Sequence, residues 1–396
     1  MSGRAGGGEA RALVERFGSP LYVYDVQAVE AAYRGFAGCF SYEPVEFHYA
    51  IVTNKNPFLV RRLVALGAGI HANTPGDAFS AMAAGVEPDR ILYSGTNLSA
   101  ADFDFLLDAG IAMNLDSLDQ IRDLSSRGRG GAIGLRLLVD DLDRASRIGV
   151  SVDELDEARA LCRRAGIRLT GLHMYAGTNT LSAGRYIGCF ERLVSAAELL
   201  PDLDCLNAGG GFGIPYLDGQ PPLDLVALGR ELSTRMSEVS TGRGRPVRLV
   251  IEPGRILVGA AGTLVVTVVS VKERGGRRYV GVDSTVGNVV VPSVYHPHHR
   301  IEALSATGPL LDVPTDVCGN TTHSRDFLGR DVRLPDVRPG DLLALRDVGA
   351  YGYAMSSHFL NRPRPAEVVL DGDDVHLTTR RETFEDLLAT LVERGP

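Results

Sequence analysis

The chain has 396 residues and a net charge of −8, with 44% hydrophobic and 23% charged residues. This composition is typical of a folded, water-soluble protein, and the length predicts two domains rather than a single core. No basic run is long enough for a nucleic-acid surface and no apolar run reaches membrane-spanning length, so we expect neither kind of partner.

The cysteines and the start of the chain indicate the compartment. The glycine-rich residues 1–8 lack the apolar core of a signal peptide, and the five cysteines are scattered with no CxxC pair. We therefore expect a protein of the reducing cytoplasm, without a disulfide framework or a zinc site. Three histidines cluster at positions 296, 298 and 299, but no acidic ligand pattern accompanies them, so no metal site is predicted.

From residue 26 to 258, short apolar runs alternate with amphipathic helical stretches. Strands are predicted at 46–51, 69–72, 91–93, 113–115, 133–138, 168–173, 205–207 and 247–251. Helices are predicted between them at 57–68, 75–84, 100–109, 117–126, 151–165 and 183–200. This alternation predicts an α/β domain, a parallel (β/α)8 barrel of the TIM type, whose strands are buried on both faces.

The pattern changes after Arg255. Small residues at 259–262 form a hinge, and β-branched runs punctuated by turns follow at 263–272, 278–282, 341–347, 366–370 and 374–379. These runs predict a C-terminal all-β domain of the sandwich or barrel kind. A strand at 19–24 is expected to complete it, so the predicted domains are 26–258 and, together, 1–25 with 259–396.

Two motifs at predicted strand ends carry groups suited to an anion. Residues 207–213 read Asn-Ala-Gly-Gly-Gly-Phe-Gly, and backbone N–H groups of such a loop can converge on a phosphate. Residues 252–255 read Glu-Pro-Gly-Arg, where the carboxylate can hold a pyridinium nitrogen protonated and the arginine fits a phosphate or carboxylate. The alternatives are a plain tight turn for the first motif and a surface ion pair for the second.

Two further segments place a tyrosine beside small residues. In residues 171–179, Tyr175 can stack on a flat ring, although a core aromatic at a strand end fits equally well. In residues 347–357, Tyr351 lies in a glycine- and alanine-lined turn, where its hydroxyl can bind a phosphate. Each segment on its own is weakly specific.

Residues 47–57, Phe-His-Tyr-Ala-Ile-Val-Thr-Asn-Lys-Asn-Pro, are the most informative stretch. They read as an apolar strand ending in a polar turn, and they resemble the strand that carries the cofactor lysine in pyridoxal-phosphate decarboxylases with an alanine-racemase-like barrel. That family has Tyr-Ala-(Val/Ile)-Lys-(Ala/Thr)-Asn, and Val52 stands at the lysine position. Valine has no amine and cannot form the Schiff base.

Together and in this order, the motifs resemble the fold-type III decarboxylases, the group of diaminopimelate and ornithine decarboxylases, over nearly the whole chain. The diaminopimelate branch matches best. The resemblance implies pyridoxal phosphate as a cofactor, an amino-acid-like substrate, and a head-to-tail homodimer with shared active sites. By the same resemblance, Glu252 faces the pyridine nitrogen, and the phosphate is held by Gly209, Gly210, Gly211, Gly254, Arg255 and Tyr351.

The resemblance also locates departures from the family. His71 replaces an aspartate on the second barrel strand, and Tyr175 replaces a ring-stacking histidine. In the loop 319–326, Thr322 stands for the catalytic cysteine and His323 for a substrate-reading acid. The substrate segment becomes 291–295, with Val291 in place of its arginine. The catalytic candidates are therefore His71, Tyr175, Thr322 and His323, and the substrate candidates are Tyr295 and Asp326.

Two residues are weighed as replacements for the lost groups. Cys318 lies four residues before Thr322, too far along a strand to stand in for the cysteine. Lys55 lies three residues after Val52, and a solvated loop lysine is its favoured interpretation over one that folds back to the cofactor.

Three functions remain open from the sequence. The first is a lyase that holds pyridoxal phosphate non-covalently and moves protons with the new histidine, tyrosine and threonine side chains. The second is an enzyme that uses the barrel mouth without this cofactor. The third is a non-catalytic homologue. An intact Glu252 favours the first, since a pure phosphate site has no use for this carboxylate. The loss of the main catalytic groups favours the second and the third.

Overall fold

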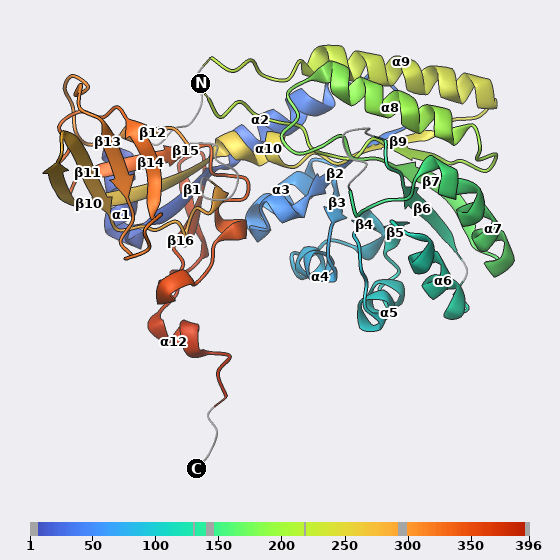
Figure 1. The fold of residues 1–396 in the computed structure, drawn as a ribbon, viewed down its shortest axis with the longest axis horizontal. Helices are drawn as coiled ribbons and strands as arrows, with labels where there is room; N and C mark the ends of the chain where they lie inside the picture. Colours follow the sequence, from blue (N-terminus) through green and yellow to red (C-terminus); the bar gives the residue numbers. More distant parts are fainter. Residues whose placement is uncertain (1–6, 130, 140–145, 218, 292–298, 393–396) are drawn as a thin grey trace. The chain divides into compact units, whose positions relative to one another are not determined.

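The computed structural model describes residues 7–129, 131–139, 146–217, 219–291 and 299–392 (Figure 1). The chain forms two compact units. The barrel unit comprises Glu30–Ile214 and Pro221–Leu257, and the β unit comprises Met1–Val29, Pro215–Gln220 and Val258–Pro396. The domain boundaries expected from the sequence, at residues 26 and 258, remain a prediction.

The barrel unit is built on eight parallel strands that close on themselves, as predicted. They are β2 (Val45–Ala50), β3 (Gly69–Ala72), β4 (Ile91–Ser94), β5 (Ala112–Leu115), β6 (Ala132–Arg136), β7 (Arg168–His173), β8 (Cys205–Asn207) and β9 (Arg248–Ile251). Each pairs with the next, and β2 pairs with β9 to close the ring.

Helices follow the strands along the chain. They are α2 (Val26–Ala37), α3 (Pro57–Ala65), α4 (Pro75–Ala83), α5 (Ala100–Asp108), α6 (Leu118–Ser126), α7 (Leu155–Ala165), α8 (Ala183–Ala197) and α9 (Leu225–Arg243). Several begin at a side-chain cap: Asn56 accepts from the Phe58 amide before α3, and Thr74 accepts from the Asp77 amide before α4. Because such caps satisfy amides that the helix leaves free, local sequence sets where each strand gives way to a helix.

The interior of the barrel is small and polar rather than apolar. Directly paired residues of parallel strands face the same side of a sheet, and the pairs His48↔Gly69 and Asn114↔Gly134 put polar side chains opposite glycines. A Cβ at Gly134 would lie 1.9 Å from Asn114 Oδ1, so glycine is required there. Barrels of this fold usually fill the same layers with bulky branched residues.

The β unit contains a nine-stranded sheet with the order β14-β13-β11-β10-β1-β16-β17, in which β15 pairs with β10 and β12. Its strands are β1 (Leu21–Asp25), β10 (Gly262–Arg274), β11 (Arg277–Val282), β12 (Ile301–Ala303), β13 (Thr315–Cys318), β14 (Phe327–Val332), β15 (Leu342–Arg346), β16 (Ala366–Asp371) and β17 (Asp374–Thr379). Strand β1 lies between β10 and β16, so the N-terminal strand does complete this sheet.

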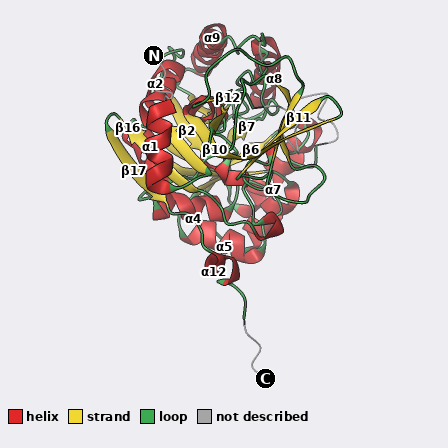
Figure 2. Cartoon of the chain, turned by 90° about the vertical axis from the view of Figure 1, so that its left-hand side faces the viewer, coloured by secondary structure: helices red, strands yellow, loops and turns green. Residues whose placement is uncertain are grey.

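Two helices in the β unit were not predicted from the sequence. Helix α1 (Gly7–Phe17) lies against this sheet (Figure 2). It buries Ala10 and Leu13 in a cluster with Leu21 and Val368 of the sheet. Helix α12 (Phe384–Leu388) follows the last strand. A helix as short as α1, with 11 residues, is marginal by itself in water, so the tertiary contact rather than periodicity stabilises it.

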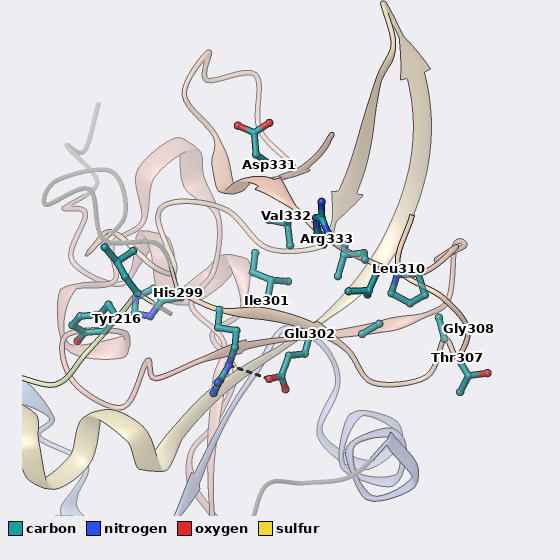
Figure 3. Close-up of a pocket in the computed structure, with 16 residues that line it drawn as sticks. Tyr216, His299, Ile301, Glu302, Thr307, Gly308, Leu310, Asp331, Val332 and Arg333 are labelled. Atoms are coloured by element: carbon teal, nitrogen blue, oxygen red, sulfur yellow. Dashed lines mark ion pairs between the residues drawn. The ribbon is translucent and has the colours of Figure 1, made fainter. Parts of the chain in front are cut away.

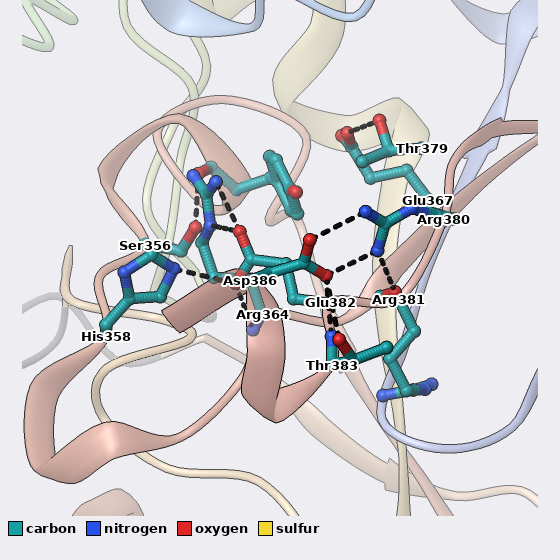
Figure 4. A network of polar contacts seen from close by, with 11 residues as sticks. Ser356, His358, Arg364, Glu367, Thr379, Arg380, Arg381, Glu382, Thr383 and Asp386 are labelled. Atoms are coloured by element: carbon teal, nitrogen blue, oxygen red, sulfur yellow. Dashed lines mark hydrogen bonds and ion pairs between the residues drawn. The ribbon is translucent and has the colours of Figure 1, made fainter. Parts of the chain in front are cut away.

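A polar network fixes the segment that leads to α12 (Figure 4). The Glu382 carboxylate accepts two hydrogen bonds from the Arg364 side chain, at 2.8 and 2.6 Å, and one from His358 Nε2 at 2.7 Å. Arg380 forms a two-fold contact with Asp386 at 2.5 and 2.7 Å. The contacts of Glu382 with Arg364 and His358 hold this segment against the loop at 358–364. The bidentate pair of Arg380 and Asp386 fixes the orientation of the segment at the start of α12.

The β unit also contains a cavity of about 810 Å³ beside β12 and the end of β14 (Figure 3). Ile301, Val332 and Leu310 form apolar parts of its wall, and Arg300 pairs with Glu302 at 3.0 Å on one side. Among the described residues that line this cavity, none was proposed from the sequence as part of the active site.

Helix α9 offers a matched test of packing in the barrel unit. A Cβ at Gly229 would lie 2.2 Å from the carbonyl oxygen of Cys39, whereas one at Gly242 meets no atom within 4 Å. We expect Gly229→Ala to lower the free energy of unfolding by about 2 kcal/mol through this clash. Gly242→Ala should raise it by up to about 1 kcal/mol through helix propensity. Urea denaturation followed by circular dichroism measures both, and equal effects would contradict the close approach of α9 to Cys39.

Candidate active site

A buried polar cluster lies where several barrel strands end. Glu252 directly follows β9, His173 is the last residue of β7, Asn207 is the last residue of β8, and His71 lies on β3. Since the strands are parallel, their carboxyl ends share one face of the barrel, which is where active sites of this fold lie. His71 and Glu252 were predicted site residues, and the structure brings them together.

Glu252 is the centre of the cluster. It is 2% exposed, and its Oε1 accepts a hydrogen bond from Asn207 Nδ2 at 2.7 Å. His173 Nε2 lies 3.2 Å from Oε2, and His71 Nε2 lies 3.4 Å from the same oxygen. Asn207 is itself held in place, because its Oδ1 accepts from the Gly209 amide at 2.8 Å. A buried carboxylate requires such partners to stay ionised.

Burial and neighbours act in opposite directions on these groups. Burial alone would raise the pKa of Glu252, but the two imidazoles and the hydrogen bonds from His173 and Asn207 outweigh it and hold this pKa well below its usual range. Burial lowers the pKa of His71 to about 4, although Glu252 opposes the shift. At neutral pH the cluster therefore contains an ionised carboxylate beside a neutral His71.

The two histidines have unused hydrogen-bonding capacity. Within the described ranges, three buried nitrogen atoms of these residues lack a hydrogen-bond partner: both ring nitrogens of His71, and Nδ1 of His173. An unmet buried polar atom costs roughly 1–3 kcal/mol, so folding alone does not explain its presence. Such atoms next to a buried carboxylate are suited to a polar ligand or to proton movement.

The glycine loop requires glycine at each of its three positions. Gly209 and Gly211 have φ of +66° and +93°. A Cβ at Gly209 would lie 2.0 Å from the Met174 carbonyl oxygen, and one at Gly210 would lie 2.5 Å from the Glu252 carbonyl oxygen. The positive φ values and the close backbone approaches account for the glycines, and the phosphate role of the loop stays a prediction.

Tyr175 lies against this loop. Its Cε2 is 3.3 Å from the position that a Cβ on Gly211 would take. Its hydroxyl contacts Thr178 Oγ1 at 2.8 Å, and the Arg136 guanidinium lies 5.3 Å from the ring centroid. The ring is therefore held between an arginine and the glycine loop, and its role toward a cofactor stays a prediction.

The turn that contains Val52 packs on the Glu-Pro-Gly-Arg motif. Val52 lies in the short 3-10 helix Ile51–Thr53 after β2 and is half-buried. A Cβ at Gly254 would lie 2.6 Å from Thr53 Cγ2, which explains the glycine in this motif. Arg255 begins the short helix α10 (Arg255–Val258) directly after it.

Lysine is scarce in the whole chain. The sequence contains two lysines, Lys55 and Lys272, and Lys272 lies on β10 of the β unit. Lys55 is exposed in the loop before α3, in line with the solvated loop lysine favoured from the sequence. Only two side-chain amines can therefore form a Schiff base with an aldehyde, and neither lies on a barrel strand.

The candidates of the β unit have mixed surroundings. Thr322 and His323 are exposed, and the His323 ring meets Phe359 edge-on at 5.3 Å. Asp326 is 4% exposed and accepts from the amides of Val286 and Thr321 at 2.8 and 2.9 Å. That carboxylate fixes two turns of its own unit, which is a structural role the sequence did not indicate.

The remaining candidates stay predictions as well. Tyr351 has φ of +60°, which a bulky residue rarely adopts and which often marks a functional position. Val291 is buried, at 3% exposed. Tyr295 lies outside the described residues.

Sequence reasoning missed two members of the buried cluster. His173 and Asn207 were quoted within motifs but were not proposed as site residues. Both are polar residues at the last position of a barrel strand, and that position was the available signal.

Comparisons with known proteins place this barrel fold in a known family. Residues 26–259 match the family model described as "Pyridoxal-dependent decarboxylase, pyridoxal binding domain". The diaminopimelate decarboxylase of Methanothermobacter thermautotrophicus is 34% identical, over 97% of this chain and 94% of its own length. That of Escherichia coli K12 is 30% identical, over 95% and 94%.

Solved structures show the same similarity. Diaminopimelate decarboxylase from Helicobacter pylori, complexed with L-lysine, superposes with a TM-score of 0.89 at 26% identity, covering 96% of this chain and 98% of that one. The enzyme from M. jannaschii, in co-complex with L-lysine, gives 0.90 at 25% identity, covering 98% and 95%.

The fold and the site define a decarboxylase-type barrel protein, and the comparisons identify the family. The chain belongs to the pyridoxal-phosphate-dependent decarboxylases of fold type III. The family expected from the motifs, its fold and its cofactor, pyridoxal phosphate, are thereby confirmed.

Membrane spans and metal clusters are both lacking in the part of the chain that the structure describes. None of its helices is both long and apolar enough to span a bilayer. No group of three or more histidine, cysteine, aspartate or glutamate side chains within these ranges is placed to hold a metal ion.

The low pKa of His71 predicts how acid affects stability. His71 has a pKa of about 4 in the folded protein against 6.5 for the free side chain, so the unfolded chain binds more protons between these values. The contribution of the neutral His71 to the free energy of unfolding is fully present above pH 6.5 and is lost as the pH falls toward 4, by about 3 kcal/mol in total. In His71→Gln, we expect the free energy of unfolding, measured by urea denaturation, to fall less steeply over this pH window.

The control for this test is His376→Gln, which removes a half-buried imidazole from β17 of the β unit. Its pH profile should follow that of the unaltered protein. A profile of His71→Gln as steep as that of the unaltered protein would contradict a neutral, buried His71.

Proposed function

We propose that this protein is a lyase of amino-acid-like substrates that binds pyridoxal phosphate without a covalent bond to lysine. The observation that carries the proposal is the buried Glu252, with Asn207 and His173 bonded to it, beside a turn whose Val52 offers no amine. A carboxylate buried to this extent is useful when a protonated ring nitrogen faces it. A site that binds only phosphate has no use for such a carboxylate.

The residues present fit both ends of the cofactor. Gly209, Gly210 and Gly211 form a loop that side chains would block, so its backbone can approach a phosphate closely. Arg255, at the start of α10, supplies a cationic fork in the same motif as Glu252. The unpaired nitrogens of His71 and His173 lie beside this carboxylate and provide polar contacts for a ligand.

When bound, pyridoxal phosphate supplies an electron sink for the bond that breaks at Cα. The chain contributes the surroundings: Glu252 holds the proton on the ring nitrogen, Tyr175 offers an aromatic face, and Arg255 with the glycine loop neutralises the phosphate. His71, neutral at neutral pH, is available to accept or return a proton near Glu252.

The missing amine has a kinetic consequence. In the family, a lysine exchanges with the product amine and so releases the product. With Val52 at this position, release depends on water, and turnover should be several orders of magnitude below that of lysine-bearing relatives on the same substrate. A slow or specialised reaction is therefore what this proposal entails.

The substrate is an amino acid or a close analogue. The relatives named above are diaminopimelate decarboxylases, and L-lysine is bound in two of the solved structures. Val291 and His323 stand where the family has an arginine and an acid, and these changes disfavour diaminopimelate itself. A substrate with a different distal group fits them better.

Spectroscopy with lysine variants tests cofactor binding. We expect saturable binding of pyridoxal phosphate, seen as a shifted absorbance band, in the unaltered protein and equally in Lys55→Arg and Lys272→Arg. Borohydride should leave no pyridoxyl group on either lysine by peptide mapping, because neither lysine lies on a barrel strand.

Each other result selects an alternative. A reducible adduct confined to Lys55 would show that this lysine replaces the missing one. No saturable binding would exclude the proposal and favour an enzyme that uses the barrel mouth without this cofactor. Tight binding without turnover of any amino acid would favour a non-catalytic homologue.

Restoring the amine is a second test of the same site. We expect Val52→Lys to give a borohydride-trapped adduct at position 52 and a red-shifted band, because the turn Ile51–Thr53 packs against the Glu252 motif through Gly254. Val52→Met matches the added length without the amine and should give neither signal. An adduct elsewhere in Val52→Lys would contradict the placement of Val52 at the cofactor.

A further inference from the structure

The barrel contains a polar cavity at the amino-terminal end of its strands, opposite to the Glu252 cluster. Its volume is about 180 Å³, enough for several water molecules. Residues at the entrance are exposed, among them Asp89, Ala112 and Ala132, so the cavity opens to solvent at the barrel floor. Polar lining residues give water the partners that it requires.

The cavity extends upward to the layer beneath Glu252. Asn114 and Asn207 are among its lining residues, and Asn207 donates to Glu252 at 2.7 Å. Gly134 and Gly171 face the same space, and a Cβ at Gly171 would lie 3.3 Å from Gly134 Cα. Glycines on adjacent strands thus keep the axis of the barrel open where bulky side chains usually fill it.

His48 lies on the wall of this cavity. It is 8% exposed, its Nε2 is 3.4 Å from Glu46 Oε2, and Glu46 also lines the cavity. The ring occupies the space beside Gly69, where a Cβ would lie 2.7 Å from it. The imidazole is therefore held between a carboxylate near the floor and the backbone of the next strand.

Small residues separate His48 from His71. The pairs His48↔Gly69 and Ala50↔His71 place the two imidazoles one level apart on neighbouring strands, on the same side of the sheet. The other two residues of these pairs, Ala50 and Gly69, have only a methyl group and a hydrogen atom as side chains. The charge of His48 acts on His71, in keeping with their proximity.

From these contacts we propose that water in the floor cavity joins the solvent to the buried cluster, and that His48 passes protons between this water and His71. The route runs from Glu46 through His48 to His71 and Glu252. Imidazole suits such a step, because it accepts a proton on one nitrogen while it releases one from the other.

The proposed function requires a source of protons, and this route would supply them. The catalytic part of the present proposal therefore rests on the proposed function. In decarboxylation the bond from Cα to the carboxylate breaks, CO2 leaves, and the electron pair that remains on Cα takes up one proton. Each turnover therefore consumes one proton from the solvent. A path through the floor supplies it while substrate fills the mouth of the barrel.

Other charged groups face this route and enter any pH dependence. Glu46 and Arg248 form an ion pair at 3.2 Å at the floor, and Asp89 lies at the entrance. Cys205 faces the cavity from β8. At the upper end, Arg136, His173 and Glu252 act on His71.

Thiol labelling tests the cavity independently of any activity. In a background with Cys39→Ser and Cys318→Ser, we expect methyl methanethiosulfonate to modify Cys205, which lines the cavity, about tenfold faster than the buried Cys189. Because burial raises the pKa of Cys205 to about 12, both rates are compared at one alkaline pH, where more of the reactive thiolate is present. Ala132→Leu narrows the entrance and should slow labelling of Cys205 by a similar factor. Ala65→Leu, exposed on α3, is the matched control and should not change the rate.

Proton exchange tests the role of His48. In protein labelled with 15N-histidine and free of cofactor, we expect the His71 imidazole proton to exchange with solvent about tenfold more slowly in His48→Phe. The His71 signal is assigned by its loss in His71→Gln. His48→Gln preserves a polar side chain and guards against a folding defect in the phenylalanine variant, and it should show slower exchange as well.

Where the decarboxylase is active, His48→Phe should lower kcat about tenfold with little change in KM and should raise the solvent deuterium isotope effect. Unchanged exchange at His71 together with equal labelling of Cys205 in Ala132→Leu and Ala65→Leu would overturn the route. Failure to bind pyridoxal phosphate would overturn the proposed function alone, since the labelling and exchange experiments use neither cofactor nor substrate.

Discussion

The burial of one negative charge is the constraint on which the barrel unit depends. Glu252 is 2% exposed, and an isolated carboxylate at this depth would take up a proton or unfold its surroundings. Asn207 and His173 prevent this by bonding to its two oxygens. Asn207 is in turn oriented by the amide of Gly209, so the glycine loop and the carboxylate are positioned by one shared residue.

The same constraint explains why the interior of the barrel is polar. A charge at the upper end of an apolar core is poorly stabilised, whereas amide and imidazole side chains along the axis lower its cost. Asn114 and His48 occupy space that Gly134 and Gly69 leave open, so the glycines and the polar side chains form matched pairs. The departure from bulky branched packing is therefore connected with the site rather than a local defect in the core.

The fold was predicted well from the sequence because its signals are local. Apolar runs that alternate with amphipathic helical stretches define the barrel, and β-branched runs with turns define the β unit, including the strand at residues 19–24. Helix α1 was missed because its partner residues, such as Val368, lie far away in the sequence. No periodicity within a short segment reports a contact of that kind.

The site was predicted less completely, for a related reason. Motifs identified Glu252, His71 and the glycine loop, but the shared oxygen of Glu252 depends on three strands that meet only in the closed barrel. Asp326 stays a substrate candidate by its motif, and the structure adds that its carboxylate bonds to the amides of two turns, one of them 40 positions away.

The surroundings of Glu252 add polar groups without adding a second negative charge. Val52, in the turn that packs on the Glu252 motif, has no ionisable group. Burial lowers the pKa of His71 to about 4, so this imidazole is neutral at neutral pH while Glu252 stays ionised. A carboxylate at position 71 would be a second buried negative charge, and two such groups within hydrogen-bond range cannot both stay ionised. A neutral imidazole is therefore the kind of neighbour that a buried Glu252 requires, because in a site of low dielectric it offers a polar contact without an opposing charge.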